Sequence, residues 1–202
     1  NKAAIIDAGA VERIKDLVLH VPLSVQSEMT ACTAVLALSE DLKPQLLDMG
    51  ICEVLLPLTD SPSIEVQGNS AAALGNLSSK ADDYSPFNAV WEKPAGGLHG
   101  YLVRFLESDD TTFQHIAVWT LIQLLESGNR DLEQHIRESP HLLQLVRQLQ
   151  SREDGSHTAE EDVDGTNQDL SPEREIAALS RRIEEILFDD SDGDDEGAGN
   201  TK

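Results

Sequence analysis

An internal repeat limits what this chain can fold into more than any other feature of its sequence. In each copy a short apolar segment ends at a glycine, and a second apolar segment begins directly after it. The anchor positions are Gly9, Gly50, Gly97 and, in a degenerate fourth copy, Ser139, at spacings of 41, 47 and 42 residues. Periods of this length are typical of solenoids built from stacked helical units. Because one unit has too little apolar surface to fold alone, neighbouring units must share a core.

A longer segment rich in small residues lies between consecutive anchors and predicts a third helix in each unit. The three copies span residues 24–39, 63–79 and 111–127, and each follows a turn that contains proline or aspartate. Glycine at the end of the first helix suits the left-handed conformation that turns the chain into the second helix. We therefore predict an all-α domain over residues 1–150, with units at about 1–41, 42–82 and 83–130 and a partial unit at 131–150.

Several blocks of this repeat resemble the armadillo-repeat family. Asp7-Ala8-Gly9-Ala10-Val11 and residues 71–77 are similar to two characteristic elements of that family. Residues 91–106 and 113–127 more specifically resemble the last repeat of the armadillo proteins of fungal vacuoles. The resemblance implies a right-handed armadillo-repeat superhelix, that is, an α-solenoid of about three repeats with a C-terminal capping half-repeat and a disordered acidic tail.

Charge divides the chain near residue 150. The net charge is −22, and residues 151–202 hold 17 of the 37 acidic residues but only 5 of the 15 basic ones. Residues 151–170 and 189–202 have few apolar side chains, so we predict a disordered acidic linker and a disordered acidic tail. Ser191, with acidic residues at +1, +3 and +4, is a candidate phosphorylation site. Because acidic chains repel phosphates and anionic lipids, we expect no binding of nucleic acid and no direct membrane contact.

A helix signal returns between the linker and the tail, at residues 171–188. Ser171 is a candidate N-cap, Pro172 suits the first helical position, and an apolar stripe follows at three- and four-residue spacing. A lone helix of this length is marginal in water, so the stripe requires a partner. Three arrangements are open: a cap on the last repeat, a tethered peptide in the protein's own groove, or a coiled coil with another chain.

The chain contains none of the residue constellations that enzymes use. It has no nucleophile motif, no zinc-binding motif and no phosphate-binding loop, and its six histidines are scattered. We therefore predict a protein that is not an enzyme, with no catalytic residue, no cofactor and no metal ion. Cys32 and Cys52 both lie within apolar helical patterns, which is typical of buried, reduced thiols.

Partner binding is expected on the concave surface that the long third helices form in a solenoid. Aligning these helices places the following residues at equivalent positions: Glu28, Ala31 and Val35; Asn69, Ala72 and Asn76; Ile116, Trp119 and Gln123. Asn76 and Trp119 match family positions that contact a bound peptide, whereas Val35 and Gln123 depart from the family's asparagine. A carboxamide suits this role because it offers a donor and an acceptor to a peptide unit. Trp119 has the alternative of packing between adjacent long helices.

The resemblance implies a protein-binding adaptor at the cytoplasmic face of the vacuolar membrane. Such proteins recruit partners for vacuole inheritance, nucleus–vacuole contacts, vacuole fusion and selective autophagy, and attach to the membrane through a lipidated N-terminus that this sequence lacks. Two alternatives remain: an importin-alpha-like adaptor for basic peptides, or a purely structural cap of a longer solenoid. We also expect Ile5, Ile6, Val11 and Ile14 to form an uncovered face that promotes self-association.

Overall fold

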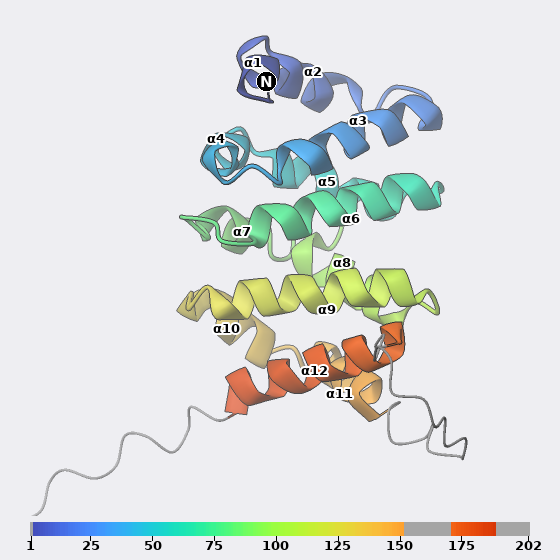
Figure 1. Cartoon of the computed structure of the whole chain (residues 1–202), viewed down its shortest axis with the longest axis vertical. Coiled ribbons are helices and arrows are strands. Elements are labelled where there is room, and N and C mark those ends of the chain that lie inside the picture. The colour runs from blue at the N-terminus through green and yellow to red at the C-terminus, as the bar shows by residue number, and fades with distance from the viewer. Residues whose placement is uncertain (1, 152–170, 189–202) are drawn as a thin grey trace, which may run out of the picture.

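A computed structural model of the protein describes residues 2–151 and 171–188, in which every regular element is a helix (Figure 1). The helices fall into four groups along the chain. These are α1 (Lys2–Asp7), α2 (Ala10–Leu17) and α3 (Leu23–Leu36); η1 (Glu40–Leu42), α4 (Lys43–Asp48), α5 (Ile51–Leu58) and α6 (Ile64–Ser78); α7 (Ser85–Ala89), α8 (Gly97–Glu107) and α9 (Thr111–Glu126); and α10 (Arg130–Arg137), α11 (Pro140–Ser151) and α12 (Pro172–Phe188). The predicted linker, the predicted tail and Ser191 lie outside the described residues, apart from Ser151, which ends α11.

Local sequence signals account for where these helices begin and end. Gly9 and Gly50 have φ angles of 77° and 70°, the left-handed conformation that the repeat pattern required between the first two helices of a unit. The long helices α6 and α9 begin at side-chain caps: the Ser63 hydroxyl accepts from the backbone of Val66, and the Asp110 carboxylate accepts from that of Thr112. The three predicted long helices are therefore present, with ends that agree within about three residues.

The long helices stack side by side to form an α-solenoid, as the sequence predicted. In Figure 1, α3, α6 and α9 lie one below the other like the rungs of a ladder, and each packs directly against the next. The shorter helices α5 and α8 pack behind α6 and α9 respectively. A large apolar core runs through the stack, and Leu74, Tyr101 and Leu121 are completely buried in it. A second, smaller cluster consists of Ile14, Val18, Leu58 and Val66. Aliphatic residues supply most of this core, as expected for a chain that is 4% aromatic.

Helix α12 continues the ladder as its last rung (Figure 1). It packs on α9 and on α11, just as α9 packs on α6 and α8. Its buried stripe consists of Ile176, Ala177, Ser180, Ile183 and Leu187. The half-repeat expected at residues 131–150 and the helix expected at 171–188 thus form one three-helix unit. Of the three arrangements left open for this helix, the structure contains the one in which it caps the last repeat.

The apolar residues that are exposed in the first unit are not the ones that the sequence predicted. Ile6, Val11 and Ile14 are at most 7% exposed, because α1 and α2 pack these side chains inward. The prediction that they form an uncovered face is therefore wrong, and Ile5 alone of the four is exposed, at 40%. Other aliphatic side chains near this end are exposed instead: Leu17, Leu19, Leu23, Val25, Val35 and Leu38. Cys32 is exposed as well, so the prediction of two buried thiols holds only for Cys52.

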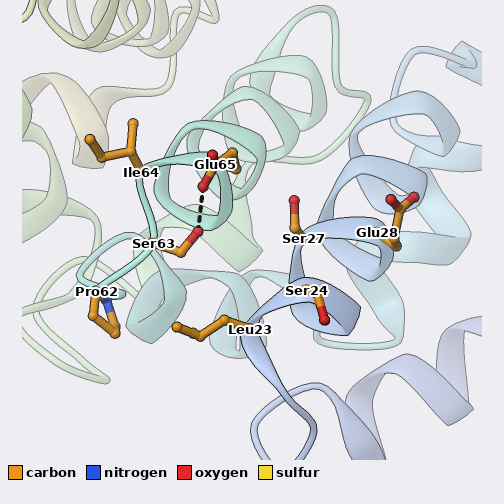
Figure 2. A pocket seen from close by; sticks show the side chains of 8 residues that line it. All are labelled: Leu23, Ser24, Ser27, Glu28, Pro62, Ser63, Ile64 and Glu65. Carbon is orange, nitrogen blue, oxygen red and sulfur yellow. Dashed lines mark hydrogen bonds between the residues drawn. The ribbon is translucent and has the colours of Figure 1, made fainter.

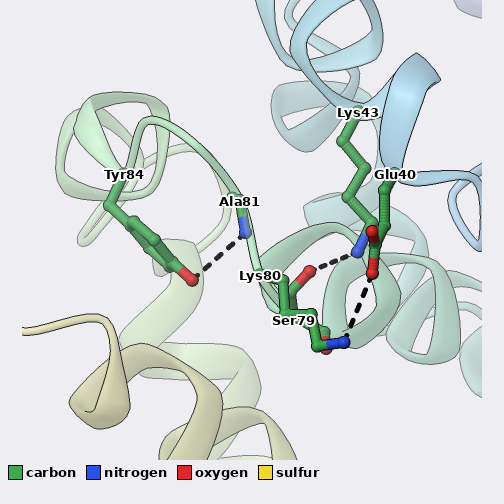
Figure 3. Close-up of polar contacts among 6 residues, drawn as sticks. All are labelled: Glu40, Lys43, Ser79, Lys80, Ala81 and Tyr84. Atoms are coloured by element: carbon green, nitrogen blue, oxygen red, sulfur yellow. Dashed lines mark hydrogen bonds and ion pairs between the residues drawn. The ribbon is translucent and has the colours of Figure 1, made fainter.

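Lysine side chains hold the carboxyl ends of two long helices. Lys43 is 4% exposed and donates from Nζ to the carbonyl of Ser79, just after α6, as Figure 3 shows. Beside it, Lys80 pairs with Glu40 at 3.4 Å, and the Tyr84 hydroxyl accepts from the backbone of Ala81. Lys2 donates in the same way to the carbonyl of Val35 in α3. A cation at this end of a helix offsets the partial negative charge of unpaired carbonyls.

Candidate protein-binding groove

The candidate groove residues lie along the ladder of long helices, but the structure uses them in different ways. Glu28 and Val35 in α3 are exposed, and Gln123 in α9 is half-buried. Asn69 and Asn76 in α6, and Ile116 and Trp119 in α9, are all half-buried. The ladder therefore places all seven residues on neighbouring helices, and their contacts decide which of them can still meet a partner.

Asn69 and Asn76 join α6 to α3. The side-chain amide Nδ2 of Asn69 donates to the carbonyl of Ser27, and that of Asn76 donates to the carbonyl of Ala34, both at 3.1 Å. Ala34 lies in the last turn of α3, where backbone carbonyls lack a partner within the helix. Each side-chain amide thus donates one hydrogen bond to the neighbouring helix, while its oxygen can still accept a hydrogen bond.

Trp119 packs in a notch that Gly75 leaves in the surface of α6. A Cβ atom on Gly75 would lie 2.8 Å from Cζ3 of Trp119 and 2.9 Å from Oγ1 of Thr120. Real Cβ contacts are essentially never that short, so the two long helices approach closely only because residue 75 has no side chain. Of the two roles left open for Trp119, the structure therefore contains the packing between adjacent long helices.

Glu28 and Val35 have no such contacts, and the repeat explains why. They occupy in α3 the positions that Asn69 and Asn76 occupy in α6, and these asparagines face the preceding long helix. Among the described residues no helix precedes α3 in the ladder. Val35 is accordingly 52% exposed, whereas Asn76, the aligned residue in α6, is half-buried.

A surface cleft between the amino ends of α3 and α6 was not predicted from the sequence. It has a volume of about 630 Å3 and is lined by Leu23, Ser24, Ser27, Glu28, Pro62, Ser63, Ile64 and Glu65 (Figure 2). The Ser63 hydroxyl donates to Oε2 of Glu65 at 2.7 Å, and this hydrogen bond lowers the pKa of the Glu65 carboxyl. Ile64, at 66% exposure, is unusually accessible for an isoleucine. The exposure of Ile64 could not be predicted from its position as the first residue of α6, because apolar residues also begin helices that are buried.

No group of three or more His, Cys, Asp or Glu side chains lies close enough together to hold a metal ion in residues 2–151 and 171–188. No helix within these ranges is long and apolar enough to span a membrane. Burial raises the pKa of the Cys52 thiol to about 12, so this thiol is protonated and unreactive at neutral pH.

Comparison with known proteins agrees with this architecture. A family model described as the Armadillo/beta-catenin-like repeat matches residues 39–79, which correspond to the unit from η1 to α6. The chain belongs to the armadillo-repeat family. The resemblance stated from its sequence motifs and the predicted fold class are thereby confirmed.

Curated relatives extend the match over nearly the whole chain. The chain is 55% identical over 187 residues to Vacuolar protein 8 of Gibberella zeae, covering 93% of this chain and 32% of the relative. For Vacuolar protein 8 of Schizosaccharomyces pombe the identity is 53% over 192 residues, covering 95% and 33%. For that of Saccharomyces cerevisiae it is 44% over 149 residues, covering 74% and 26%. The chain thus spans about a third of the length of these relatives, within their C-terminal part.

Proposed function

We propose that this chain is part of a non-enzymatic armadillo scaffold of the vacuole, whose ladder of long helices binds segments of partner proteins. The observation that carries the proposal is the continuous ladder from α3 to α12, in a chain that is 53–55% identical to Vacuolar protein 8 of two fungi. In this role the protein would act at the cytoplasmic face of the vacuolar membrane, held there by a lipidated segment outside this sequence. Its partners would serve vacuole inheritance, nucleus–vacuole contacts, vacuole fusion and selective autophagy.

Several features of the ladder support protein binding over other ligands. The chain carries a net charge of −22, which disfavours nucleic acid and anionic lipid. The half-buried side chains of Ile116 and Gln123, with the free amide oxygens of Asn69 and Asn76, offer apolar contacts and hydrogen-bond acceptors to a peptide. Solenoids present such extended surfaces because each unit adds one helix to the same side.

Site-specific photocrosslinking tests this proposal without disturbing the internal contacts of the ladder. A photoreactive residue would replace Glu28 or Gln123 on the ladder and, as a control, Gln148, which is exposed on α11. We expect crosslinks from the two ladder positions to the same vacuole-associated proteins, and none of these from Gln148. If all three positions capture the same proteins, or if the ladder positions capture none, the ladder is not the binding surface.

A purely structural cap is the second candidate, and a specific observation favours it. Asn69, Asn76 and Trp119 all contact neighbouring long helices, so the residues that match the family's peptide-binding positions also hold the stack together. In that case ladder substitutions would change stability without changing partner binding. The importin-alpha-like alternative gains no support from the structure, because its single matching tryptophan is packed against Gly75.

Self-association is proposed for the exposed aliphatic side chains on and around α3. The exposed aliphatic side chains of α3 and the residues beside it would meet those of a second copy. Light scattering at rising protein concentration would then show mass growth, and V35E together with L38E should suppress it. A mass that stays monomeric at all concentrations would refute the proposal.

A further inference from the structure

We infer that the surface formed by α9 and α11 is a binding site for an amphipathic helix, which α12 occupies as a tethered ligand. A partner helix with apolar residues at the spacing of Ile176, Ile183 and Leu187 would then bind there in place of α12. Three observations support this inference: the connection to α12, the nature of its contacts and its position at the end of the ladder. A helix of this length is also marginally stable in isolation.

The connection that leads into α12 is much longer than the equivalent connections in the other units. The second and third helices of the first three units are joined by residues 18–22, 59–63 and 108–110, whereas residues 152–171 join α11 to α12. The short connections hold their long helices in place covalently. A longer connection costs more entropy to close, so it holds its helix in place less strongly than a short one does.

The contacts of α12 lack the features that fix α6 and α9 in the ladder. Asparagine side chains tie α6 to α3, and a glycine notch receives Trp119 of α9, but α12 contains no asparagine, glutamine or glycine. The polar contacts that the described residues make with α12 are partly exposed: Arg147–Glu184 at 2.8 Å, Glu126–Arg182 at 3.8 Å and the approach of His115 to Glu175 at 3.1 Å. The guanidinium groups of Arg137 and Arg147 also lie 6.0 and 5.7 Å from the centre of the Phe188 ring. Pairs of this kind contribute little to stability.

The buried face of α12 includes one hydroxyl group, as that of α6 does at Ser70. Ser180 is completely buried, and its hydroxyl has no hydrogen-bond partner among the described residues. A buried hydroxyl without a partner costs free energy that an apolar residue would not. The partner helix that binds best at this site would therefore carry alanine or another small apolar residue at the position of Ser180.

The position of α12 allows it to leave without breaking the rest of the stack. It packs on α9 and α11, and no other described helix lies beyond it (Figure 1). The remaining core still joins α9 to α6 and α8, and α11 to α8 and α10. Once detached, an isolated helix of this length is marginally stable, so α12 would unfold as it leaves. The two states then differ by local unfolding of one helix.

Hydrogen exchange on the intact chain tests whether α12 opens on its own. We expect the backbone amides of α12 to exchange at least ten-fold faster than those of α9, and as one group. If α12 and α9 exchange at the same rate, the two helices open together and the inference is wrong.

A cleavable tether then tests whether the site accepts a helix in trans. The recognition sequence of a site-specific protease would be placed within residues 152–170 of the full chain, and a fluorescent peptide of residues 171–188 would be titrated before and after cleavage. We expect binding to the cut protein, and binding on the order of 100-fold weaker to the uncut protein, where tethered α12 competes. The cut protein must keep the helical circular dichroism of α1–α11.

Two peptide variants make the test specific to the buried face of α12. I183D places a charge where Ile183 is completely buried and should abolish binding, whereas A178D alters the exposed face and should bind as the parent does. Equal binding of both variants, no binding to a folded cut protein, or unfolding of α9 when α12 departs would each overturn the inference.

Discussion

Replacing Gly75 by alanine tests the close approach of α6 and α9, with Gly68 as a matched control in the same helix. The added Cβ at residue 75 would lie 2.8 Å from the Trp119 ring and 2.9 Å from the Thr120 hydroxyl oxygen. At residue 68 the nearest atom, Cε1 of Phe113, would be 3.6 Å away, an ordinary van der Waals contact. Both glycines are inside α6, so the two substitutions differ mainly in what the new methyl group meets.

The expected magnitudes follow from two opposing effects. Alanine in place of glycine within a helix stabilises by about 0.5–1 kcal/mol, because glycine loses more conformational entropy on folding. Overpacking at Gly75 costs about 1–3 kcal/mol, because the Trp119 ring and α9 must shift. We therefore expect G68A to be slightly more stable than the parent and G75A to fall below G68A by about 1–3 kcal/mol. At this chain length each kcal/mol changes Tm by about 2–4 °C.

Urea unfolding followed by far-ultraviolet circular dichroism would measure both variants. A third variant, W119L, and its combination with G75A complete a double-mutant cycle, because removing the ring should relieve most of the cost of the methyl group. We expect a coupling free energy of at least about 1 kcal/mol between residues 75 and 119. If G75A is as stable as G68A, or if the cycle shows no coupling, the packing of Trp119 against Gly75 is not as described.

Three further predictions concern single side chains. Under native conditions a thiol reagent should modify Cys32, which is exposed, and leave Cys52, which is buried with a pKa raised to about 12, unmodified until the protein is denatured; rapid reaction of both would contradict the structure. Asn76→Ala should lower the free energy of unfolding by about 0.5–1.5 kcal/mol, because the bond to the carbonyl of Ala34 is lost, whereas Gln123→Ala should change it by less than about 0.5 kcal/mol. Burial lowers the pKa of Lys43 below its usual 10.5, so the unfolded chain binds the proton more tightly and the parent should gain stability as the pH rises toward 10.5. The Lys43→Met variant should lack this gain in stability with pH. If the free energy of unfolding changes with pH in the same way for parent and variant, the prediction is wrong.

The positions of the helices could be predicted from the sequence because their signals are local. A left-handed residue is needed where the first helix of a unit meets the second, and glycine supplies it at residues 9 and 50. Side-chain caps at Ser63 and Asp110 mark the starts of long helices in the same way. Such signals act over three or four residues, so the chain carries them wherever the unit lies in the stack.

The role of the candidate groove residues could be predicted only in part. The alignment placed Asn69, Asn76 and Trp119 on the ladder of long helices, but their contacts are two carbonyls in α3 and a glycine in α6, 42 to 44 residues away. Periodicity shows which side of a helix a residue occupies, and leaves open which neighbour approaches that side. The cleft beside Ile64 was missed for the same reason, since its walls come from two units.

The sequence by itself determined the number of helices in each unit, their turns and the need for stacking, because the apolar residues of each helix exceed what one helix can bury. Tertiary structure alone decided which surfaces the stack covers. Ile6, Val11 and Ile14 are buried within the first unit, while Val35 and Cys32 are exposed on α3, before which the described residues include no other long helix of the ladder. It also decided that α12 becomes the last rung of the ladder, since an amphipathic stripe is equally suited to any apolar surface within reach.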